Sequence, residues 1–118
     1  MDERKRLGDR GEEEVARWLR GHGYRVLASQ YRCRFGEIDL IARSREGVLC
    51  FVEVKTRSAG GFAAAREAVT AAKQRRLRTT AQLYLAQTGE GESPCRFDVA
   101  EVYPGPMGYE INYIANAF

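Results

Sequence analysis

The stretch from Gly36 to Arg57 reads GEIDLIARSREGVLCFVEVKTR and decides the fold, because it holds two apolar segments joined by a short polar turn. Its segments Glu37–Arg43 and Val48–Thr56 are rich in Ile, Leu, Val and Phe, a composition that favours β-strands. Arg45-Glu46-Gly47 lies between them and suits a three-residue loop that closes with Gly47 in the left-handed conformation. The stretch therefore predicts an antiparallel β-hairpin.

The predicted hairpin places ionisable side chains in strands that are apolar enough for the centre of a sheet. In the register set by the loop, paired residue numbers sum to 92, so Asp39 lies opposite Glu53 and Glu37 opposite Lys55, all on one face. Buried carboxylates are costly unless a cation compensates them. Two carboxylates about 5 Å apart across a strand pair suit a hard cation such as Mg²⁺, which one or two carboxylates and several waters hold.

Two predicted helices each bring one charged side chain to this sheet. Residues 7–21 form the first, ended by Gly21 and Gly23, and Glu12 falls on its apolar stripe with Val15, Ala16 and Leu19. The second runs from about Ala65 to Thr88 and ends at Gly89. Lys73 lies on its apolar stripe, so we expect both Glu12 and Lys73 to face the sheet.

The remaining segments complete a small α/β domain. A loop is expected at Ser58–Gly61, and the further strands are Tyr24–Ser29, Arg96–Tyr103 and, after a turn at Pro104–Gly108, Tyr109–Ile114. The predicted order is α-β-β-β-α-β-β. We expect residues 1–118 to form one domain with a mixed β-sheet flanked by helices.

Composition excludes several classes of protein. The chain has 118 residues, of which 44% are hydrophobic and 30% charged, and a net charge of +3, which is typical of a soluble globular domain and permits nucleic-acid binding. No apolar run reaches the length of a membrane span, and the charged N-terminus lacks the apolar region of a signal peptide. We therefore expect a cytoplasmic protein without a membrane partner.

Cysteine and histidine usage excludes other kinds of site. The three cysteines, Cys33, Cys50 and Cys95, form no C-x-x-C pair, which argues against a zinc site or a disulfide framework. The single histidine, His22, lies between two glycines at the expected helix end, where a catalytic role is not expected.

A structural interpretation of the same charges stays open at this stage. Glu37 and Lys55 would form a cross-strand ion pair, Lys73 would extend to water, and Glu12 would pair with Arg34 or Arg43. The active-site interpretation is favoured because all of these charges converge on one face of the sheet.

Several motifs together carry a family resemblance. Asp39, thirteen residues and then Glu53-Val54-Lys55 resemble the PD-(D/E)xK motif of restriction-endonuclease-like nucleases, with Ile38 in the place of the motif's proline. Nearly the whole chain resembles the bacterial YraN family, which is similar to archaeal Holliday-junction resolvases. The motifs that carry this resemblance are Gly11-Glu12, Gly23-Tyr24, Gly36–Ile41, Phe51–Arg57, Lys73, Arg96–Val99 and Asn116-Ala117-Phe118.

The resemblance implies a restriction-endonuclease-like α/β fold and a metal-dependent endonuclease acting on structured or branched DNA. Its catalytic set would be Glu12, Asp39, Glu53 and Lys55. Mg²⁺ or Mn²⁺ would be held by Asp39, Glu53, the carbonyl of Val54 and Glu12. The expected contacts to the nucleic-acid backbone are Lys73, Arg57, Arg34, Arg32 and Arg76, with Arg75 and Arg78 as further candidates.

Three functions remain open from the sequence. Besides the endonuclease, the chain would suit a non-catalytic DNA- or RNA-binding module that keeps the nuclease fold, or a protein-interaction adaptor whose ion cluster is structural. Resolvase-like enzymes often act as dimers, so a homodimer is also an expectation.

Overall fold

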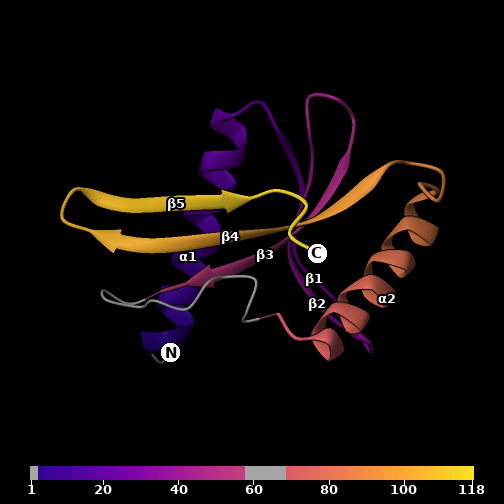
Figure 1. Cartoon of the computed structure of the whole chain (residues 1–118), viewed down its shortest axis with the longest axis horizontal. Coiled ribbons are helices and arrows are strands. Elements are labelled where there is room, and N and C mark those ends of the chain that lie inside the picture. The colour runs from indigo at the N-terminus through magenta and orange to yellow at the C-terminus, as the bar shows by residue number, and fades with distance from the viewer. Residues whose placement is uncertain (1–2, 58–68) are drawn as a thin grey trace.

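A computed structural model of the chain describes residues 3–57 and 69–118. The elements follow the predicted order α-β-β-β-α-β-β (Figure 1). They are α1 (Glu3–Gly21), β1 (Arg25–Cys33), β2 (Gly36–Arg43), β3 (Leu49–Thr56), α2 (Ala71–Thr88), β4 (Cys95–Gly105) and β5 (Gly108–Ile114). The expected α/β architecture, a mixed sheet flanked by helices, is thereby confirmed.

The five strands form one sheet in the order β1-β2-β3-β4-β5. All neighbours are antiparallel except β3 and β4, which are parallel. A parallel pair needs a crossover connection, and α2 lies in that connection. The β4–β5 hairpin extends beyond the rest of the sheet as an arm (Figure 1).

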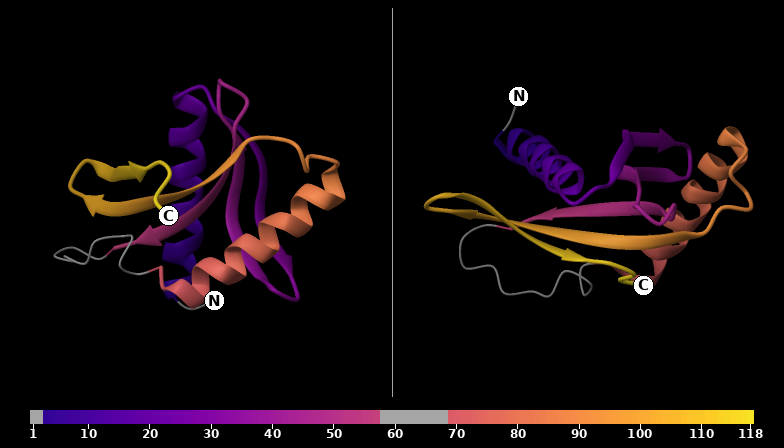
Figure 2. Two further views of the ribbon diagram at one scale, coloured as in Figure 1. Left: turned by 45° about the vertical axis from the view of Figure 1, so that its right-hand side comes forward. Right: turned by 90° about the horizontal axis from the view of Figure 1, so that it is seen from above.

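Each face of the sheet carries its own hydrophobic cluster. Val15 and Leu19 of α1 pack on one face with alternate strand residues such as Val52. Leu77 and Ala81 of α2 pack on the other with residues such as Phe51. In the left view of Figure 2, α2 crosses in front of the β1 and β2 strands and α1 lies behind β4. The apolar stripes predicted for both helices are therefore confirmed.

The β2–β3 hairpin adopts the predicted register. The observed pairs are Arg43–Leu49, Ala42–Cys50, Ile41–Phe51 and Leu40–Val52, and each pair sums to 92. Gly47 has φ +87°, the left-handed conformation that the turn requires. The ladder ends at Leu40–Val52, so the expected strand pairs Asp39–Glu53 and Glu37–Lys55 do not form, and that part of the prediction was wrong. The side chain of Asp39 instead accepts a hydrogen bond from the backbone N–H of Val54 at 2.8 Å.

The start of α2 differs from the prediction. Thr70 is extended (φ −67°, ψ 164°), and its side chain caps the helix by accepting a hydrogen bond from the N–H of Lys73. The helix therefore begins at Ala71, and a start at Ala65 was wrong because Val69 and Thr70 are not helical; residues 65–68 and the predicted loop at Ser58–Gly61 lie outside the described residues. Its end is as predicted, with Gly89 left-handed at φ +70°.

Other boundaries move by a few residues. Helix α1 begins at Glu3 rather than residue 7. Strand β1 continues to Cys33 instead of ending at Ser29, because its polar second half pairs with β2 as an edge strand. Strands β4 and β5 extend to Gly105 and from Gly108, so the turn between them is shorter than Pro104–Gly108. Neither of the described helices has the length and apolar character to cross a membrane.

Candidate active site

Asp39 lies at the point where β2 and β3 separate. Its Oδ2 accepts the hydrogen bond from Val54, so the carboxylate occupies the place that the next strand pair would fill. Burial raises the pKa of Asp39 to about 8, and the nearby negative charge of Glu53 adds to the effect, while the Val54 N–H opposes it. A carboxylate with a strongly raised pKa beside other acids is characteristic of functional sites.

Glu53 is held between two lysines. It is 7% exposed, and its Oε1 lies 2.6 Å from Nζ of Lys73 and 3.5 Å from Nζ of Lys55. Burial lowers the pKa of Lys55, the proximity of Lys73 lowers it further, and Glu53 only partly offsets both. Burial acts to lower the pKa of Lys73, but its hydrogen bonds to Glu53 and Lys55 and the negative charges of Glu53 and Asp39 together outweigh burial and leave the pKa raised.

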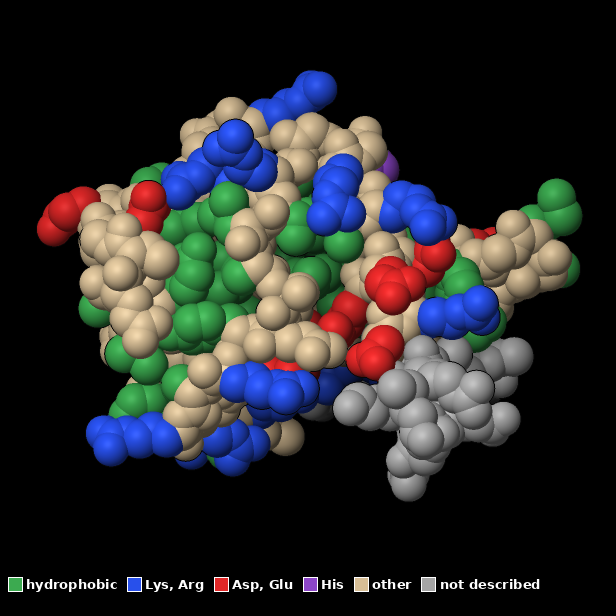
Figure 3. Space-filling model, turned by 180° about the vertical axis from the view of Figure 1, so that it is seen from behind, with side chains coloured by type: hydrophobic (Ala, Val, Ile, Leu, Met, Phe, Trp, Pro, Cys, Tyr) green, Lys and Arg blue, Asp and Glu red, His purple; other side chains and the backbone are tan. Residues whose placement is uncertain are grey.

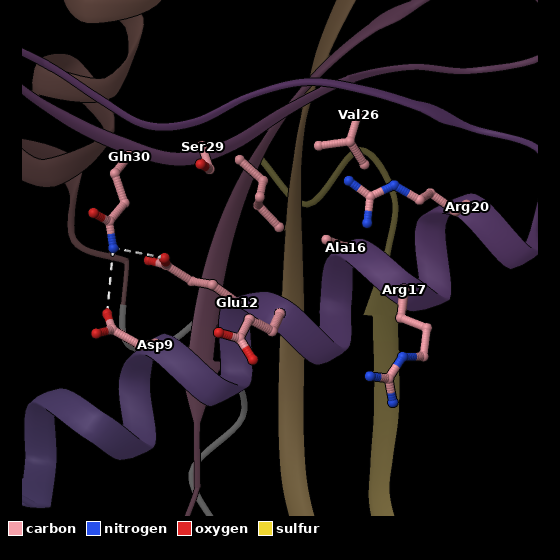
Figure 4. Close-up of a pocket in the computed structure, with 10 residues that line it drawn as sticks. Asp9, Glu12, Ala16, Arg17, Arg20, Val26, Ser29 and Gln30 are labelled. Carbon is pink, nitrogen blue, oxygen red and sulfur yellow. Dashed lines mark hydrogen bonds between the residues drawn. The ribbon is translucent and has the colours of Figure 1, made fainter.

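Glu12 approaches the same place from α1. Its Oε2 accepts a hydrogen bond from Nε2 of Gln30 at 2.9 Å, and the same amide reaches Oδ1 of Asp9 at 3.3 Å (Figure 4). Burial raises the pKa of Glu12, although hydrogen bonds to Gln30 and Asp39 oppose the rise. Glu12 therefore connects helix α1 with the acids of the hairpin, as its place on the apolar stripe predicted.

Gln30 is a site residue that the sequence analysis missed. It lies within β1 but has φ +50°, a left-handed conformation that is uncommon outside glycine. This local break in the strand accompanies the hydrogen bond from its amide to Glu12. No sequence pattern marks a single glutamine in a polar edge strand for such a role.

Two cavities are lined by members of the acid cluster, which consists of Glu12, Asp39 and Glu53. One of about 200 Å³ is lined by residues that include Gly36, Asp39, Glu53, Lys73 and Arg76. A larger cavity of about 610 Å³ runs along α1 and is lined by Glu12, with Arg17 and Arg20 farther along the helix (Figure 4). The smaller cavity is the better candidate for chemistry, because it holds both hairpin acids and a lysine.

The donor set fits a hard divalent cation. Asp39, Glu53 and Glu12 offer only carboxylate oxygens, which suit Mg²⁺ or Mn²⁺ better than zinc. In the described part of the chain no three acidic, cysteine or histidine side chains are gathered closely enough to form a complete metal cage. Mg²⁺ takes only one or two protein carboxylates and fills its remaining positions with water or phosphate, so Asp39 and Glu53 are the residues that would hold it.

The particular contacts expected under the structural interpretation are not the ones that the structure shows. Glu37 pairs with Arg32 at 3.1 Å rather than with Lys55. Arg43 pairs with Glu90 at 2.9 Å, and Glu12 has Gln30 as its partner instead of Arg34 or Arg43. Lys73 does not extend to water, since it contacts Glu53.

The basic residues expected to contact nucleic acid fall into two groups. Arg32, Arg34 and Arg76 are exposed near the smaller cavity or the β1–β2 turn. By contrast, Arg57 is directed toward Glu101, with Nε 3.7 Å from its Oε2 and only 18% of the side chain exposed, and Lys73 is engaged by Glu53. Arg75 is exposed on α2, and the guanidinium of Arg78 lies over the ring of Phe97 at 5.0 Å.

On the face seen in Figure 3, acidic side chains gather in one area and Lys and Arg side chains surround it. The surrounding Lys and Arg side chains suit contact with a polyanion such as nucleic acid.

Comparison with known proteins places the chain in a family. Residues 11–102 match the family described as "Uncharacterised protein family UPF0102". The chain belongs to UPF0102. The matched range contains Glu12, Asp39, Glu53 and Lys55, so the whole candidate site lies within the part that defines the family.

Relatives in UPF0102 match almost end to end. The chain is 54% identical over 115 residues to UPF0102 protein STH1475 of Symbiobacterium thermophilum, covering 97% of each chain. It is 50% identical over 122 residues to UPF0102 protein gll3754 of Gloeobacter violaceus, covering 100% of this chain and 96% of the relative.

Similarity to solved structures is weaker. A chain of an EndoMS complex with double-stranded DNA matches with TM-score 0.40 and 16% identity over 74% of this chain and 34% of its own length. Pyrococcus furiosus SfsA in complex with Ca²⁺ matches with TM-score 0.40 and 14% identity, over 94% of this chain and 63% of its own.

Proposed function

We propose that this UPF0102 protein is a metal-dependent endonuclease that hydrolyses phosphodiester bonds in structured or branched DNA. The observation that carries the proposal is the convergence of Glu12, Asp39 and Glu53 with Lys55 and Lys73 where β2 and β3 separate. Asp39, Glu53 and Lys73 line a cavity of about 200 Å³. Lys55 joins them through its contact with Glu53, and Glu12 approaches Asp39 from α1. Carboxylates and amines in this combination serve phosphoryl transfer, which needs charge neutralisation and a positioned nucleophile.

The metal ligands would be Asp39, Glu53 and the carbonyl of Val54, with Glu12 reaching the ion directly or through water. A bound Mg²⁺ or Mn²⁺ would supply charge neutralisation at the phosphate and a more acidic water. The raised pKa of Asp39 supports this assignment, because a divalent cation would relieve the repulsion between its carboxylate and that of Glu53.

The two lysines would have different roles. Lys55, the lysine of the E-x-K pair, would orient the attacking water or stabilise the negative charge that develops on the phosphate oxygens. Lys73 neutralises Glu53 through a 2.6 Å contact and would turn toward the phosphate once a cation occupies the carboxylates. Lys55 lies on β3 of the hairpin itself, and Lys73 lies on α2, which packs on the same sheet.

Arginines around the cavity would bind the phosphate backbone. Arg76 lines the cavity, and Arg32 and Arg34 lie on the adjoining β1–β2 hairpin. Contacts of this kind fix position without reading base edges, so we expect recognition of shape rather than sequence. This expectation agrees with a structured or branched substrate.

The competing function is a nucleic-acid-binding module without catalysis. A pure binder gains nothing from three carboxylates directed at the phosphate path, since they would repel the ligand. The acid cluster therefore favours the enzyme.

The experiment is cleavage of a labelled panel, comprising a four-way junction, a flap, a duplex and a single strand. Wild type and Asp39→Ala are purified identically and assayed with Mg²⁺, with Mn²⁺ and with EDTA. We expect cutting by wild type alone, only with metal, and undiminished DNA binding by Asp39→Ala.

Equal cutting by both proteins would reveal a contaminant and contradict the proposal. If neither protein cuts and both bind in a salt-dependent manner, the non-catalytic module replaces the enzyme. Loss of folding in Asp39→Ala with an inactive wild type would instead support a structural cluster.

A further inference from the structure

An exposed aromatic side chain caps the turn between β1 and β2, beside the candidate active site. Phe35 is 38% exposed, and among the described residues the other large hydrophobic side chains this exposed are Leu27 and Met107. The next residue, Gly36, lines the cavity that contains Asp39 and Glu53. The tip of this hairpin projects past α2 (Figure 2).

The turn is held firmly against α2. The N–H of Phe35 donates to Sγ of Cys33 at 3.3 Å, and that thiol donates to Oγ1 of Thr80 at 3.7 Å. Any Cβ at Gly36 would lie 3.2 Å from the same Thr80 oxygen, so the backbone of the turn packs directly on the helix. Phe35 is thus presented from a fixed base, which lowers the entropy cost of using it in binding.

Two arginine side chains lie near Phe35 or near the turn that carries it. The guanidinium of Arg34 lies 4.8 Å from the centroid of Phe35, and Arg76 stands between the turn and the cavity, with its Cβ 3.8 Å from where a Cβ on Gly36 would be. An aromatic face beside guanidinium groups binds unpaired nucleotides well, because the base stacks on the ring while its phosphates meet the cations.

We propose that Phe35 stacks on an unpaired base adjacent to the phosphate held in the cavity, so that the substrate class is DNA with unpaired nucleotides at the cleavage point. The inference rests on the proposed function and deepens it: the ring selects substrates in which a base is already unstacked. A fully paired duplex offers no face to Phe35 and would bind through the phosphate contacts alone.

The test is equilibrium binding with catalytically inactive protein, using Asp39→Asn as the background so that no DNA is cut. The probes are a flap and a fully paired duplex of the same sequence, with the fluorescent base 2-aminopurine at the branch. Phe35→Ala is compared with Phe35→Trp, which keeps an aromatic face. Leu27→Ala is the matched control, because Leu27 is 37% exposed and lies on the same hairpin.

We expect Phe35→Ala to weaken flap binding roughly ten-fold, the typical loss for one stacked base, and to abolish the change in 2-aminopurine fluorescence. Duplex binding should change by less than about two-fold. Phe35→Trp should retain flap binding, and Leu27→Ala should match the background.

Two outcomes overturn the inference and are distinguishable. Should Phe35→Ala bind the flap as tightly as the background, with the same fluorescence change, the stacking role is wrong while the nuclease proposal stands. Absence of DNA binding in every variant, together with no cleavage by wild type, overturns both.

Discussion

The carboxylate of Asp39 accepts a hydrogen bond from the backbone N–H of Val54, a donor that would otherwise pair with a carbonyl of the neighbouring strand. Because the Val54 N–H is satisfied by this side chain, β2 and β3 can separate without leaving a buried donor unpaired. The separation admits Glu12 from one side and Lys73 from the other. One residue therefore both opens the sheet and contributes an acid to the opening.

The raised pKa of Asp39 makes stability depend on pH in the metal-free protein. The pKa of Asp39 is about 8 in the folded state and 3.8 in the unfolded chain. Between these two pH values the folded state therefore binds more protons than the unfolded state. Stability contributed by the protonated group is complete below the lower pKa and is lost as pH rises through the upper one.

We expect the free energy of unfolding in EDTA to fall between pH 5 and pH 9, by at most about 1.4 kcal/mol per pH unit from this group. Urea denaturation of wild type and Asp39→Asn measures it, since asparagine stays neutral. A slope that is identical in the two proteins would contradict the assignment.

Gly11 permits the closest contact between α1 and β3. A Cβ at this position would overlap Oγ1 of Thr56, and Val54 Cγ1 lies 3.6 Å away. Overpacking of this kind costs about 1–3 kcal/mol, against a gain of about 1 kcal/mol from the higher helix propensity of alanine. We expect Gly11→Ala to lower the urea midpoint, and Thr56→Ala to relieve that loss in the double variant.

Gly21→Ala is the control for Gly11→Ala, because no heavy atom lies within 4 Å of a Cβ there. It should leave the urea midpoint unchanged or raise it slightly. Equal effects of the two substitutions would mean that close packing is not what requires Gly11.

At the scale of residues, the sequence predicted on which face of its strand or helix each charged residue lies, but not which side chain it contacts. Two-residue periodicity placed Asp39 and Glu53 on one face, and helical periodicity placed Glu12 on the sheet-facing stripe of α1, because periodicity depends only on local geometry. The expected convergence of all the charges on one face was wrong, since α1 and α2 pack on opposite faces of the sheet. The contact between Lys73 and Glu53 joins residues distant in sequence, and its distance depends on how α2 crosses the sheet. The left-handed Gln30 depends likewise on tertiary packing.

At the scale of elements, Thr70 fixes where α2 begins. Its side chain accepts a hydrogen bond from the N–H of Lys73, the residue whose amine contacts Glu53. Removing an N-cap hydroxyl costs about 1 kcal/mol. We expect Thr70→Ala to lose about that much stability by urea denaturation, and Thr70→Ser to retain wild-type stability; equal losses in both variants would exclude the capping role.

Strands β4 and β5 are joined by a buried carboxylate. Asp98 is 0% exposed and accepts hydrogen bonds from Arg96 Nε at 3.0 Å, from Asn116 N at 2.8 Å and from the hydroxyl of Tyr113. This ionic network lies away from the acid cluster, and Nη2 of Arg96 also donates to the hydroxyl of Tyr24 at 2.8 Å. We interpret it as structural.

Tyr113→Phe should therefore destabilise the protein by about 1.5–3 kcal/mol, the usual cost of removing a hydrogen bond to a charged group. Tyr109→Phe is the control on the same strand, because no side-chain hydrogen bond involves its hydroxyl among the described residues. Thermal and urea denaturation measure both. A Tyr113→Phe protein as stable as the control would show that the hydroxyl contributes nothing.

Element order and hairpin register could be predicted, whereas several boundaries could not. Gly47 and the three-residue loop fix the register locally, so every observed β2–β3 pair agrees with it. The start of α2 follows an alanine-rich stretch whose composition favours helix on both sides of Thr70. The cap at Thr70 is decided by backbone geometry that composition does not encode.

At the scale of the whole molecule, the site lies between two hydrophobic clusters rather than within either. The clusters on the α1 and α2 faces hold the sheet rigid up to Leu40 and Val52, and the acids begin at the next residues. Rigid support on both sides holds the carboxylates close together despite their mutual repulsion. This arrangement is what a preorganised cation site requires.

The most direct measurement is single-turnover cleavage of the best substrate in the panel, with Mg²⁺ or Mn²⁺, by wild type, Glu53→Gln and Glu46→Gln. Glu46 is an exposed acid in the turn of the same hairpin and takes no part in the site. We predict that Glu53→Gln loses at least about 100-fold in rate while Glu46→Gln stays within about two-fold of wild type. An inactive wild type, or equal rates for the two variants, would contradict the assignment of the acid cluster as a nuclease active site.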